Sequence, residues 1–402
     1  MEMDRIAYRH ARREAERRRN RRLAAGIAAG AFAVFAIAAA VIAWRASAAQ
    51  PRRALASSAS RVATTAPTPS ATPTPSLEPT LPSGPTTITV SAVGDMIFDR
   101  NVKSLIASKG GAAPLADVAA RLSSADVAVG NLESPLSVAG SQEPSKSVTF
   151  RGSPKAIEGL TASGFDFVSL ANNHALDYGK AALADTISAL DAAGIAHAGA
   201  GADRSAAYAP AIIVRRGARI AYLAFSDVVP PGFAADARRG GIATGGRMST
   251  VTDAIKQAKT QADYVIVSFH WGVEYQDDAT SQQVRDARAA VDAGADVVAA
   301  HHPHVIQAVE MYKGKLIAYT LGDFVFDHYS RKTGEAFILD ASIGPAGVTG
   351  VTVTPVYLDG NGKPKIVEGQ DAAVILQRLR TISAKRNTNV NVQGSTATVT
   401  AR

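Results

Sequence analysis

The sequence predicts an α/β fold for the part of the chain that begins near Thr86. From Thr87 onward, apolar runs of strand type alternate with helix-like segments, which is the pattern of β-α-β units. Five of these runs lead to a short polar motif. Loops that leave the carboxyl ends of strands converge on one crevice in α/β proteins. We therefore expect the five motifs to form one site.

The five runs are the predicted strands of the site. In chain order they cover residues 87–93, 125–129, 165–170, 264–269 and 297–300. The motifs that follow them are Gly94-Asp95, Gly130-Asn131-Leu132-Glu133, Asn172-Asn173-His174, His270-Trp271-Gly272 and His301-His302-Pro303-His304.

Start and stop signals mark the helices between these strands. Ser153 and Pro154 suit the N-cap and first positions of a helix that continues over 155–162, and Gly164 suits its end. Two further helices, 180–193 and 281–293, are followed by Gly194 and Gly294.

The remaining predicted elements are strands. Arg216-Gly217 separates the apolar segments 212–214 and 220–225, which predicts a hairpin. Beyond Gly322 the chain is mostly of strand type, with candidates at 337–343 and 348–357.

The first 85 residues are not expected to belong to this fold. Residues 1–22 carry nine arginines against four acidic residues, and residues 23–44 carry no charge. About 20 apolar residues span a bilayer, and arginines on the N-terminal flank keep that end in the cytoplasm. We therefore expect a basic cytoplasmic segment, a single transmembrane helix over 23–44, and a domain outside the cytoplasm.

A cleaved signal peptide is the alternative to this anchor. Ala46-Ser47-Ala48 resembles a cleavage site, but the apolar run is longer than that of a usual signal. Residues 45–85 are rich in alanine, proline, serine and threonine, which predicts a disordered, extended linker. Residues 86–385 would then be the folded domain, and residues 386–402 a polar tail.

The positive charge of the chain lies in its N-terminal part. The formal net charge is +8. Residues 1–22, with nine arginines and four acidic residues, contribute +5, and residues 45–86, with four arginines and one glutamate, contribute +3. The rest is neutral, so we expect no nucleic-acid partner. The chain has no cysteine, which excludes disulfides and thiolate chemistry.

The histidines are the first candidates for a metal site. Five of the eight histidines lie in three of the strand-end motifs. His302 and His304 flank Pro303, which disfavours a helix, and side chains at i and i+2 of an extended segment project to one side. Both rings are therefore expected to face one metal ion.

Other polar residues at the strand ends could serve the same site. Asp95 and Glu133 can ligate a divalent cation, although an aspartate after a strand is more often a cap or turn residue. The carbonyl of Asn173 can also ligate, and His174 can protonate a leaving oxygen. Asp177 could orient His174 or cap the next helix, and the sequence leaves both roles open.

Alone, His270 would be a satisfied core residue at the end of an apolar strand. With the other histidines, the carboxylates and the asparagine amide, it completes a mixed nitrogen and oxygen ligand set. Such a set predicts one or two divalent ions of the Mn, Fe or Zn class. Glu274 is placed outside the ligands, and His301 and Asp323 are left open between site and structural roles.

The ordered motifs, from Gly94-Asp95 to His302-Pro303-His304, resemble the CapA family of capsule or poly-gamma-glutamate biosynthesis proteins, within the calcineurin-like metallophosphatase superfamily. The resemblance covers roughly Thr86 to Tyr357. It implies a four-layer α/β/β/α sandwich with the metal site at the strand ends and His174 as general acid. The metal ligands that it implies are Asp95, Glu133, Asn173, His270, His302 and His304.

Three positions depart from the related patterns. Ile97 stands where typical metallophosphatases have a histidine, and Glu133 stands where they have an aspartate, and CapA-like proteins share both changes. Family members usually have asparagine at the position of Asp323.

The resemblance implies a membrane-anchored metal-dependent phosphoesterase that acts on a cell-envelope substrate during polymer synthesis outside the cytoplasm. The alternative is a noncatalytic accessory subunit that works with membrane polymer synthase subunits.

Overall fold

The computed structural model describes residues 86–402. The expected cytoplasmic segment, transmembrane helix and linker lie outside the described residues. Within 86–402, no helix has the length and apolar character needed to cross a membrane.

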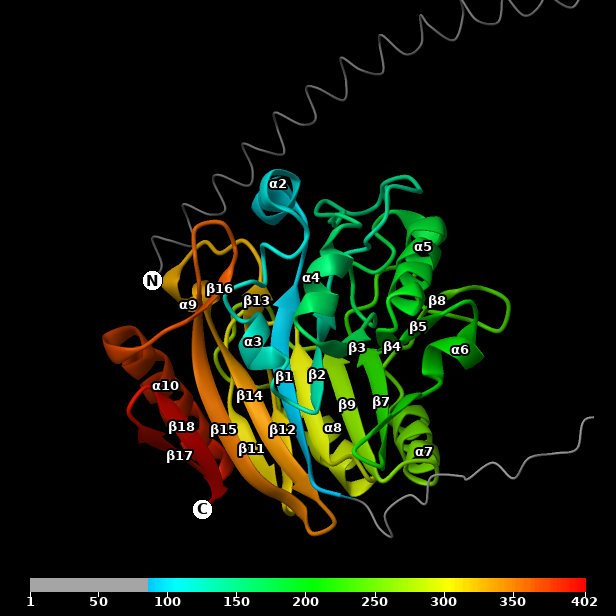
Figure 1. Ribbon diagram of the computed structural model, residues 1–402. Coiled ribbons are helices and arrows are strands. Elements are labelled where there is room, and N and C mark those ends of the chain that lie inside the picture. The colour runs from blue at the N-terminus through cyan, green and yellow to red at the C-terminus, as the bar shows by residue number, and fades with distance from the viewer. Residues whose placement is uncertain (1–85) are drawn as a thin grey trace, which may run out of the picture. The chain divides into compact units, whose positions relative to one another are not determined.

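Two β-sheets form the centre of the domain (Figure 1). The larger sheet has ten strands. Eight of them lie in the order β17 (Thr388–Gln393), β18 (Thr396–Ala401), β15 (Gly347–Leu358), β14 (Glu335–Gly344), β1 (Ile88–Met96), β2 (Val127–Leu132), β3 (Phe165–Ser169) and β4 (Ala196–Ala198), while β13 (Asp323–Val325) pairs with β1 and β16 (Pro364–Ile366) with β15.

The smaller sheet has six strands. They lie in the order β11 (Val309–Tyr312), β12 (Lys315–Ala318), β10 (Val297–His301), β9 (Tyr264–His270), β7 (Ala218–Ser226) and β6 (Ala211–Arg215). A separate pair is formed by β5 (Ala200–Gly201) and β8 (Gly241–Ile242).

Helices cover the outer face of each sheet. On the larger sheet lie α2 (Arg100–Lys109), α3 (Ala119–Leu122), α4 (Ala156–Ala162) and α5 (Gly179–Ala192). On the smaller sheet lie α7 (Met248–Lys259) and α8 (Ser281–Asp292). The other helices are α6 (Arg204–Tyr208), α9 (Arg331–Gly334), the 3₁₀ turn η1 (Ala384–Arg386), and α10 (Gly369–Ser383), which packs on β15 and β17.

The alternation of side chains along each strand explains the layers. In β1, Val90 and Ala92 face the core between the two sheets, whereas Val93 and Met96 face the helices α2 to α5. Both faces of the strand are buried, as is usual for parallel strands with helices on one side. The layer order is therefore helix, sheet, sheet, helix, as the family resemblance implies.

Most predicted elements are confirmed, with one small shift. The five strands and the hairpin of β6 and β7 are present, and Gly194 and Gly294 follow their helices with positive φ angles of 71° and 121°. The helix expected from Pro154 begins instead at Ala156, with Lys155 as its N-cap. Ser153 and Pro154 form a turn before it.

The polar tail expected over 386–402 is wrong. This segment contains the β-hairpin of β17 and β18, and β18 extends the larger sheet by pairing with β15. The reason is a short alternation of apolar residues that the many threonines and asparagines obscure. Val390, Ala397 and Val399 are buried in the main core, beside α10.

Candidate metal centre

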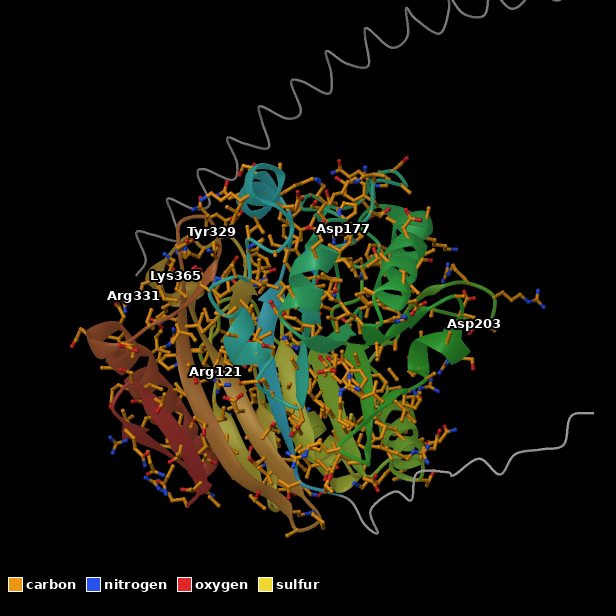
Figure 2. All side chains as sticks on the ribbon, viewed as in Figure 1. Arg121, Asp177, Asp203, Tyr329, Arg331 and Lys365 are labelled. Carbon is orange, nitrogen blue, oxygen red and sulfur yellow. The ribbon has the colours of Figure 1, made fainter. Side chains whose placement is uncertain are left out.

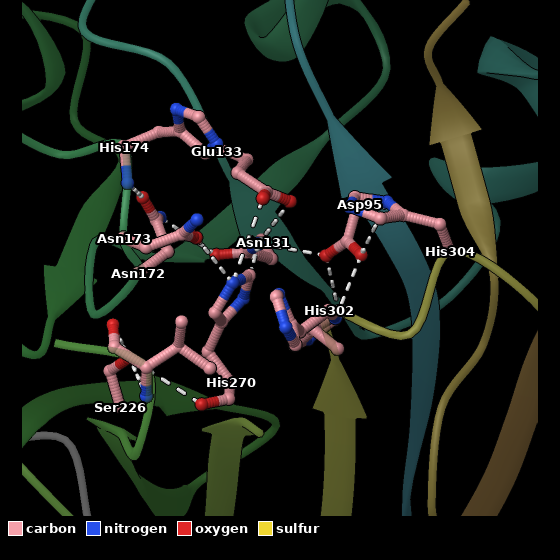
Figure 3. A network of polar contacts seen from close by, with 12 residues as sticks. Asp95, Asn131, Glu133, Asn172, Asn173, His174, Ser226, His270, His302 and His304 are labelled. Atoms are coloured by element: carbon pink, nitrogen blue, oxygen red, sulfur yellow. Dashed lines mark hydrogen bonds and ion pairs between the residues drawn. The ribbon is translucent and has the colours of Figure 1, made fainter. Parts of the chain in front are cut away.

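The candidate site lies where strands of both sheets end (Figure 3). The parallel strands β1, β2 and β3 of the larger sheet deliver Asp95, Glu133 and Asn173. The parallel strands β9 and β10 of the smaller sheet deliver His270 and His302. Figure 2 shows Asp177 and Tyr329 toward the same end of the molecule. The predicted convergence is thus observed, and it involves two facing sheets.

One buried asparagine organises the two carboxylates. The Nδ2 group of Asn131 donates to Asp95 Oδ1 at 2.8 Å and to Glu133 Oε2 at 3.3 Å. The other oxygen of Asp95 accepts the backbone N–H of His302 at 2.9 Å. Glu133 Oε1 is buried without a hydrogen-bond partner among residues 86–402, and it lies 3.6 Å from His270 Nε2.

The two adjacent asparagines have different roles. Asn172 is fully buried and joins the strand ends, because its Nδ2 donates to Asn131 Oδ1 and to the Leu132 carbonyl at 3.1 and 2.9 Å. Asn173 instead directs Oδ1 toward His270 Nε2, at 2.8 Å (Figure 3). Asn173 is therefore the asparagine with a side chain available to the site, as the sequence predicts.

The loop of His302 and His304 does not have the expected extended backbone. Both residues have positive φ angles, 96° and 55°, which L-residues rarely adopt. Their rings still lie together, with centroids 5.8 Å apart, and the ring of His270 is 4.8 Å from that of His302. The convergence thus comes from a strained turn around Pro303, and strain of this kind is concentrated at functional sites.

The pKa values of the two carboxyl groups are shifted in opposite directions. Burial acts to raise the pKa of Asp95, but His301 and the charges of His270 and His304 outweigh it and hold that pKa well below its usual range. Burial and the negative charge of Asp95 raise the pKa of Glu133 well above its usual value. Without a cation, Asp95 is ionised at neutral pH, whereas Glu133 holds its proton more tightly than an ordinary glutamate does.

The three histidines also differ. Burial and the charge of His302 lower the pKa of His270 well below its usual value. Burial and the charge of His304 lower the pKa of His302 to about 3. For His304, burial acts in the same direction, but Asp323 raises its pKa to about 10. Asp323 Oδ1 lies 2.8 Å from His304 Nδ1, so it leaves Nε2 as the nitrogen that can bind a ligand.

These residues fit a divalent cation. Ligand atoms of Glu133, His270 and His302 lie within 4.8 Å of one another, and so do those of Asp95, Glu133 and His304. Glu133 belongs to both groups. The unpartnered Glu133 Oε1 and His302 Nδ1 are buried atoms that a cation would satisfy. The mixed nitrogen and oxygen donors suit Mn, Fe or Zn.

His174 lies in a second polar cluster, beside Asn173. Its Nδ1 is 2.6 Å from Asp177 Oδ2 and 3.1 Å from Lys146 Nζ. Lys146 also donates to Asp177 Oδ1 and to the Asn173 carbonyl, and the N–H of Phe150 donates to Asp177 Oδ2 at 2.7 Å. Asp177 does not cap the next helix, because the N-cap of α5 is Tyr178. We call Lys146, His174 and Asp177 the histidine cluster.

Sequence reasoning missed Lys146 and undervalued His301. Lys146 lies in the long loop after β2, outside any motif, so no local signal connects it with His174. His301 was left open, and the structure places its Nδ1 3.2 Å from Asp95 Oδ1. Trp271 packs beside the site: it is buried, its ring stacks on Phe269 at 4.2 Å, and Nε1 donates to the Tyr319 carbonyl at 3.1 Å.

Comparison with known proteins gives consistent matches. Residues 89–328 match the family described as bacterial capsule synthesis protein PGA_cap. The chain is 32% identical over 275 residues to the PGA biosynthesis protein CapA of Bacillus subtilis (strain 168), covering 67% of this chain and 71% of the relative. It is 31% identical over 284 residues to the capsule biosynthesis protein CapA of Bacillus anthracis, covering 69% of each.

Two further matches concern a shorter aligned region and a solved structure. A probable polyglutamine synthesis accessory protein of Mycobacterium tuberculosis (strain ATCC 25618 / H37Rv) is 36% identical over 222 residues, covering 53% of this chain and 58% of that protein. Among solved structures, the NAD nucleotidase NadN of Haemophilus influenzae aligns with a TM-score of 0.40 and 12% identity, covering 74% of this chain and 64% of that one.

Proposed function

The chain belongs to the bacterial capsule synthesis protein family PGA_cap, and we propose that it is a metal-dependent phosphoesterase that acts on a cell-envelope substrate during capsule or poly-gamma-glutamate synthesis. One observation carries the proposal. Two carboxylates and three histidines meet in one buried cluster that leaves Glu133 Oε1 and His302 Nδ1 without partners in the described chain. A buried cluster of this composition is complete only when it binds a cation.

The ligands of the cation would be Asp95, Glu133, Asn173, His270, His302 and His304. A divalent cation at this place supplies Lewis-acid polarisation of a phosphoryl oxygen. Asp323 would fix the ring of His304 through Nδ1, and Asn131 would fix both carboxylates.

His174 would donate a proton to the leaving oxygen of the substrate. Burial lowers its pKa to about 4 despite Asp177, so the free site holds an uncharged ring. Because Asp177 accepts at 2.6 Å from Nδ1, the proton of the neutral ring lies on Nδ1 and Nε2 carries a lone pair. To act as general acid, His174 must first gain a proton at Nε2. Asp177 would stabilise the resulting imidazolium.

The test uses the purified full-length chain with Mn²⁺ and two substrates, a nitrophenyl phosphomonoester and a bis-nitrophenyl phosphodiester. We expect hydrolysis of at least one substrate, and loss of more than about 99% of it in His302→Ala. The matched control is His197→Ala, which removes a histidine outside the cluster. Metal binding without hydrolysis of either ester would contradict the proposal.

A noncatalytic accessory role is the second candidate. The Mycobacterium tuberculosis relative is named a probable accessory protein, which favours this role. In that case, partner subunits of a membrane polymer synthase would co-purify with the chain, and polymer would still form when metal ligands are replaced.

We also propose that the chain is anchored in the cell membrane by residues 23–44, with the folded domain outside the cytoplasm. The uncharged run and the arginines before it support this placement. Protease added to intact cells is expected to digest the domain and to spare residues 1–22.

A further inference from the structure

Glu274 lies in the loop that follows β9 and Trp271, beside the loop of the two candidate histidine ligands. The backbone N–H of the next residue, Tyr275, donates to the Pro303 carbonyl at 2.7 Å, so the two loops are joined. Gly272 and Tyr275 have positive φ angles of 89° and 64°. The backbone therefore turns sharply before and after Glu274, and this turn holds it next to the histidines.

The side chains of this region have the geometry of a cation site. One carboxylate oxygen of Glu274 and one ring nitrogen from each of His302 and His304 lie within 4.8 Å of one another. Divalent cations bind such atoms at about 2.0 to 2.6 Å, so two ligands of one ion lie up to about 4 to 5 Å apart. The three atoms can thus hold one ion without a change of fold.

A second observation also points to a ligand at this position. The side chain of His302 is buried, and its Nδ1 has no hydrogen-bond partner within residues 86–402. A buried polar atom without a partner costs free energy, which a bound cation would recover.

The group of Glu274, His302 and His304 differs in solvent exposure from the two ligand groups that share one of its histidines. Glu274 is exposed, whereas every member of the other two groups is buried. One of those groups consists of Glu133, His270 and His302, and the other of Asp95, Glu133 and His304. We propose that Glu274 is a cation ligand and that, with His302 and His304, it forms an outer, solvent-facing position for a divalent cation such as Mn²⁺. Because His304 has one free ring nitrogen, Nε2, an ion at this outer position takes the place of an ion held by Asp95, Glu133 and His304. The inference rests on the proposed function, because it extends the metal site of that function.

The test is an equilibrium titration of the full-length chain with Mn²⁺, in which the free ion is counted from its six-line EPR signal. In Glu274→Gln, we expect the dissociation constant of the weakest bound equivalent to rise at least about tenfold, with the tighter equivalents unchanged. Because Glu274 is exposed, the melting temperature of the metal-free variant should equal that of the parent within about 2 °C.

Asp227→Asn is the matched control for the loss of a nearby negative charge. Asp227 follows β7, its N–H donates to the His270 carbonyl at 2.9 Å, and it belongs to none of the three ligand groups. This variant should change every dissociation constant by less than about threefold.

Two results would overturn the inference, and they are distinguishable. If Glu274→Gln binds every equivalent of Mn²⁺ as tightly as the parent, Glu274 is not a ligand, and the proposed function stands. If the parent chain itself binds no Mn²⁺, the metal centre fails, and the proposed function fails with it.

Discussion

Two neighbouring parts of the site differ in whether their buried polar atoms have hydrogen-bond partners. In the ligand cluster around Asp95, Glu133 Oε1 and His302 Nδ1 have no hydrogen-bond partner among the described residues. In the histidine cluster, Asp177 accepts from Lys146, from the Phe150 N–H and from His174. The first cluster is incomplete without a ligand, whereas the second is complete by itself.

This difference predicts which property, folding stability or cation binding, a substitution in each cluster should reduce most. Removing a side chain from the complete cluster leaves a buried charge unpaired, so folding should lose most. Removing a side chain from the incomplete cluster takes away an atom that folding leaves unsatisfied, so cation binding should lose most. Each prediction below can break this contrast.

The largest effect is expected for Lys146→Met. The side chain of Lys146 is 12% exposed and that of Asp177 is fully buried, so the change leaves the Asp177 carboxylate without its cation. We expect the free energy of unfolding, measured with urea, to fall by about 3 kcal/mol. Lys180→Met, at an exposed position of α5, should change it by less than about 0.5 kcal/mol. A loss below about 1 kcal/mol in Lys146→Met would break the contrast.

The second effect concerns His302→Ala. We expect Mn²⁺ affinity to fall by about a hundredfold or more, because even residues that only orient ligands change affinity by about 10- to 100-fold. Metal-free stability should fall by less than in Lys146→Met, since Nδ1 of His302 has no partner to lose. Equal Mn²⁺ affinity in the variant and the parent would remove His302 from the ligands.

The sequence predicts the incomplete cluster much better than the complete one. The ligand candidates Asp95, Glu133, Asn173, His270 and His302 all lie at or within four residues of the carboxyl end of a strand, so strand order alone brings them to one place. Lys146 reaches His174 from a loop of irregular structure, and its partner is 28 positions away. No local periodicity reports a contact of that kind.

The fold shows the same division between strong and weak local signals. Long apolar strands and helices that end at glycine are predicted within a few residues. The hairpin of β17 and β18 is missed, because its apolar residues are few and lie among threonines and asparagines. The turn at His302 is missed as well, since its positive φ is imposed by tertiary contacts such as the N–H of His302 on Asp95.

The third effect is a pH dependence of cation binding. Burial and Asp95 raise the pKa of Glu133 well above its usual value, and Asp323 raises that of His304 to about 10 against the effect of burial. His304 therefore holds a proton at neutral pH that it must release to bind a cation, and the raised pKa of Glu133 acts in the same direction, so affinity should increase with pH. We expect at least about a tenfold gain per pH unit between pH 6 and 8. Calorimetry in buffers of different ionisation enthalpy measures the number of protons released on binding. An affinity that does not change with pH would contradict this prediction.

The smallest effect is expected for Asp227→Asn. Asp227 faces an acid instead of a lysine, so it serves as a comparison for the stabilisation of the Asp177 carboxylate by Lys146. Burial and the charge of Asp286 raise the pKa of Asp227 to about 6. A raised carboxyl pKa means that the folded state holds the proton more tightly than the unfolded chain, so this contribution to stability is complete below about pH 4 and is lost as the pH rises through 6.

At pH 7, the ionised Asp227 therefore destabilises the fold, and Asp227→Asn should be more stable than the parent by about 1 kcal/mol, after allowance for solvent screening. The gain should disappear at pH 4, where the parent carboxyl is protonated. Urea unfolding at the two pH values measures this difference. A buried carboxylate near the site thus destabilises the fold when it faces another acid and stabilises it when it faces Lys146. If Asp227→Asn gains less stability over the parent at pH 7 than at pH 4, the charge facing the carboxylate does not control its contribution.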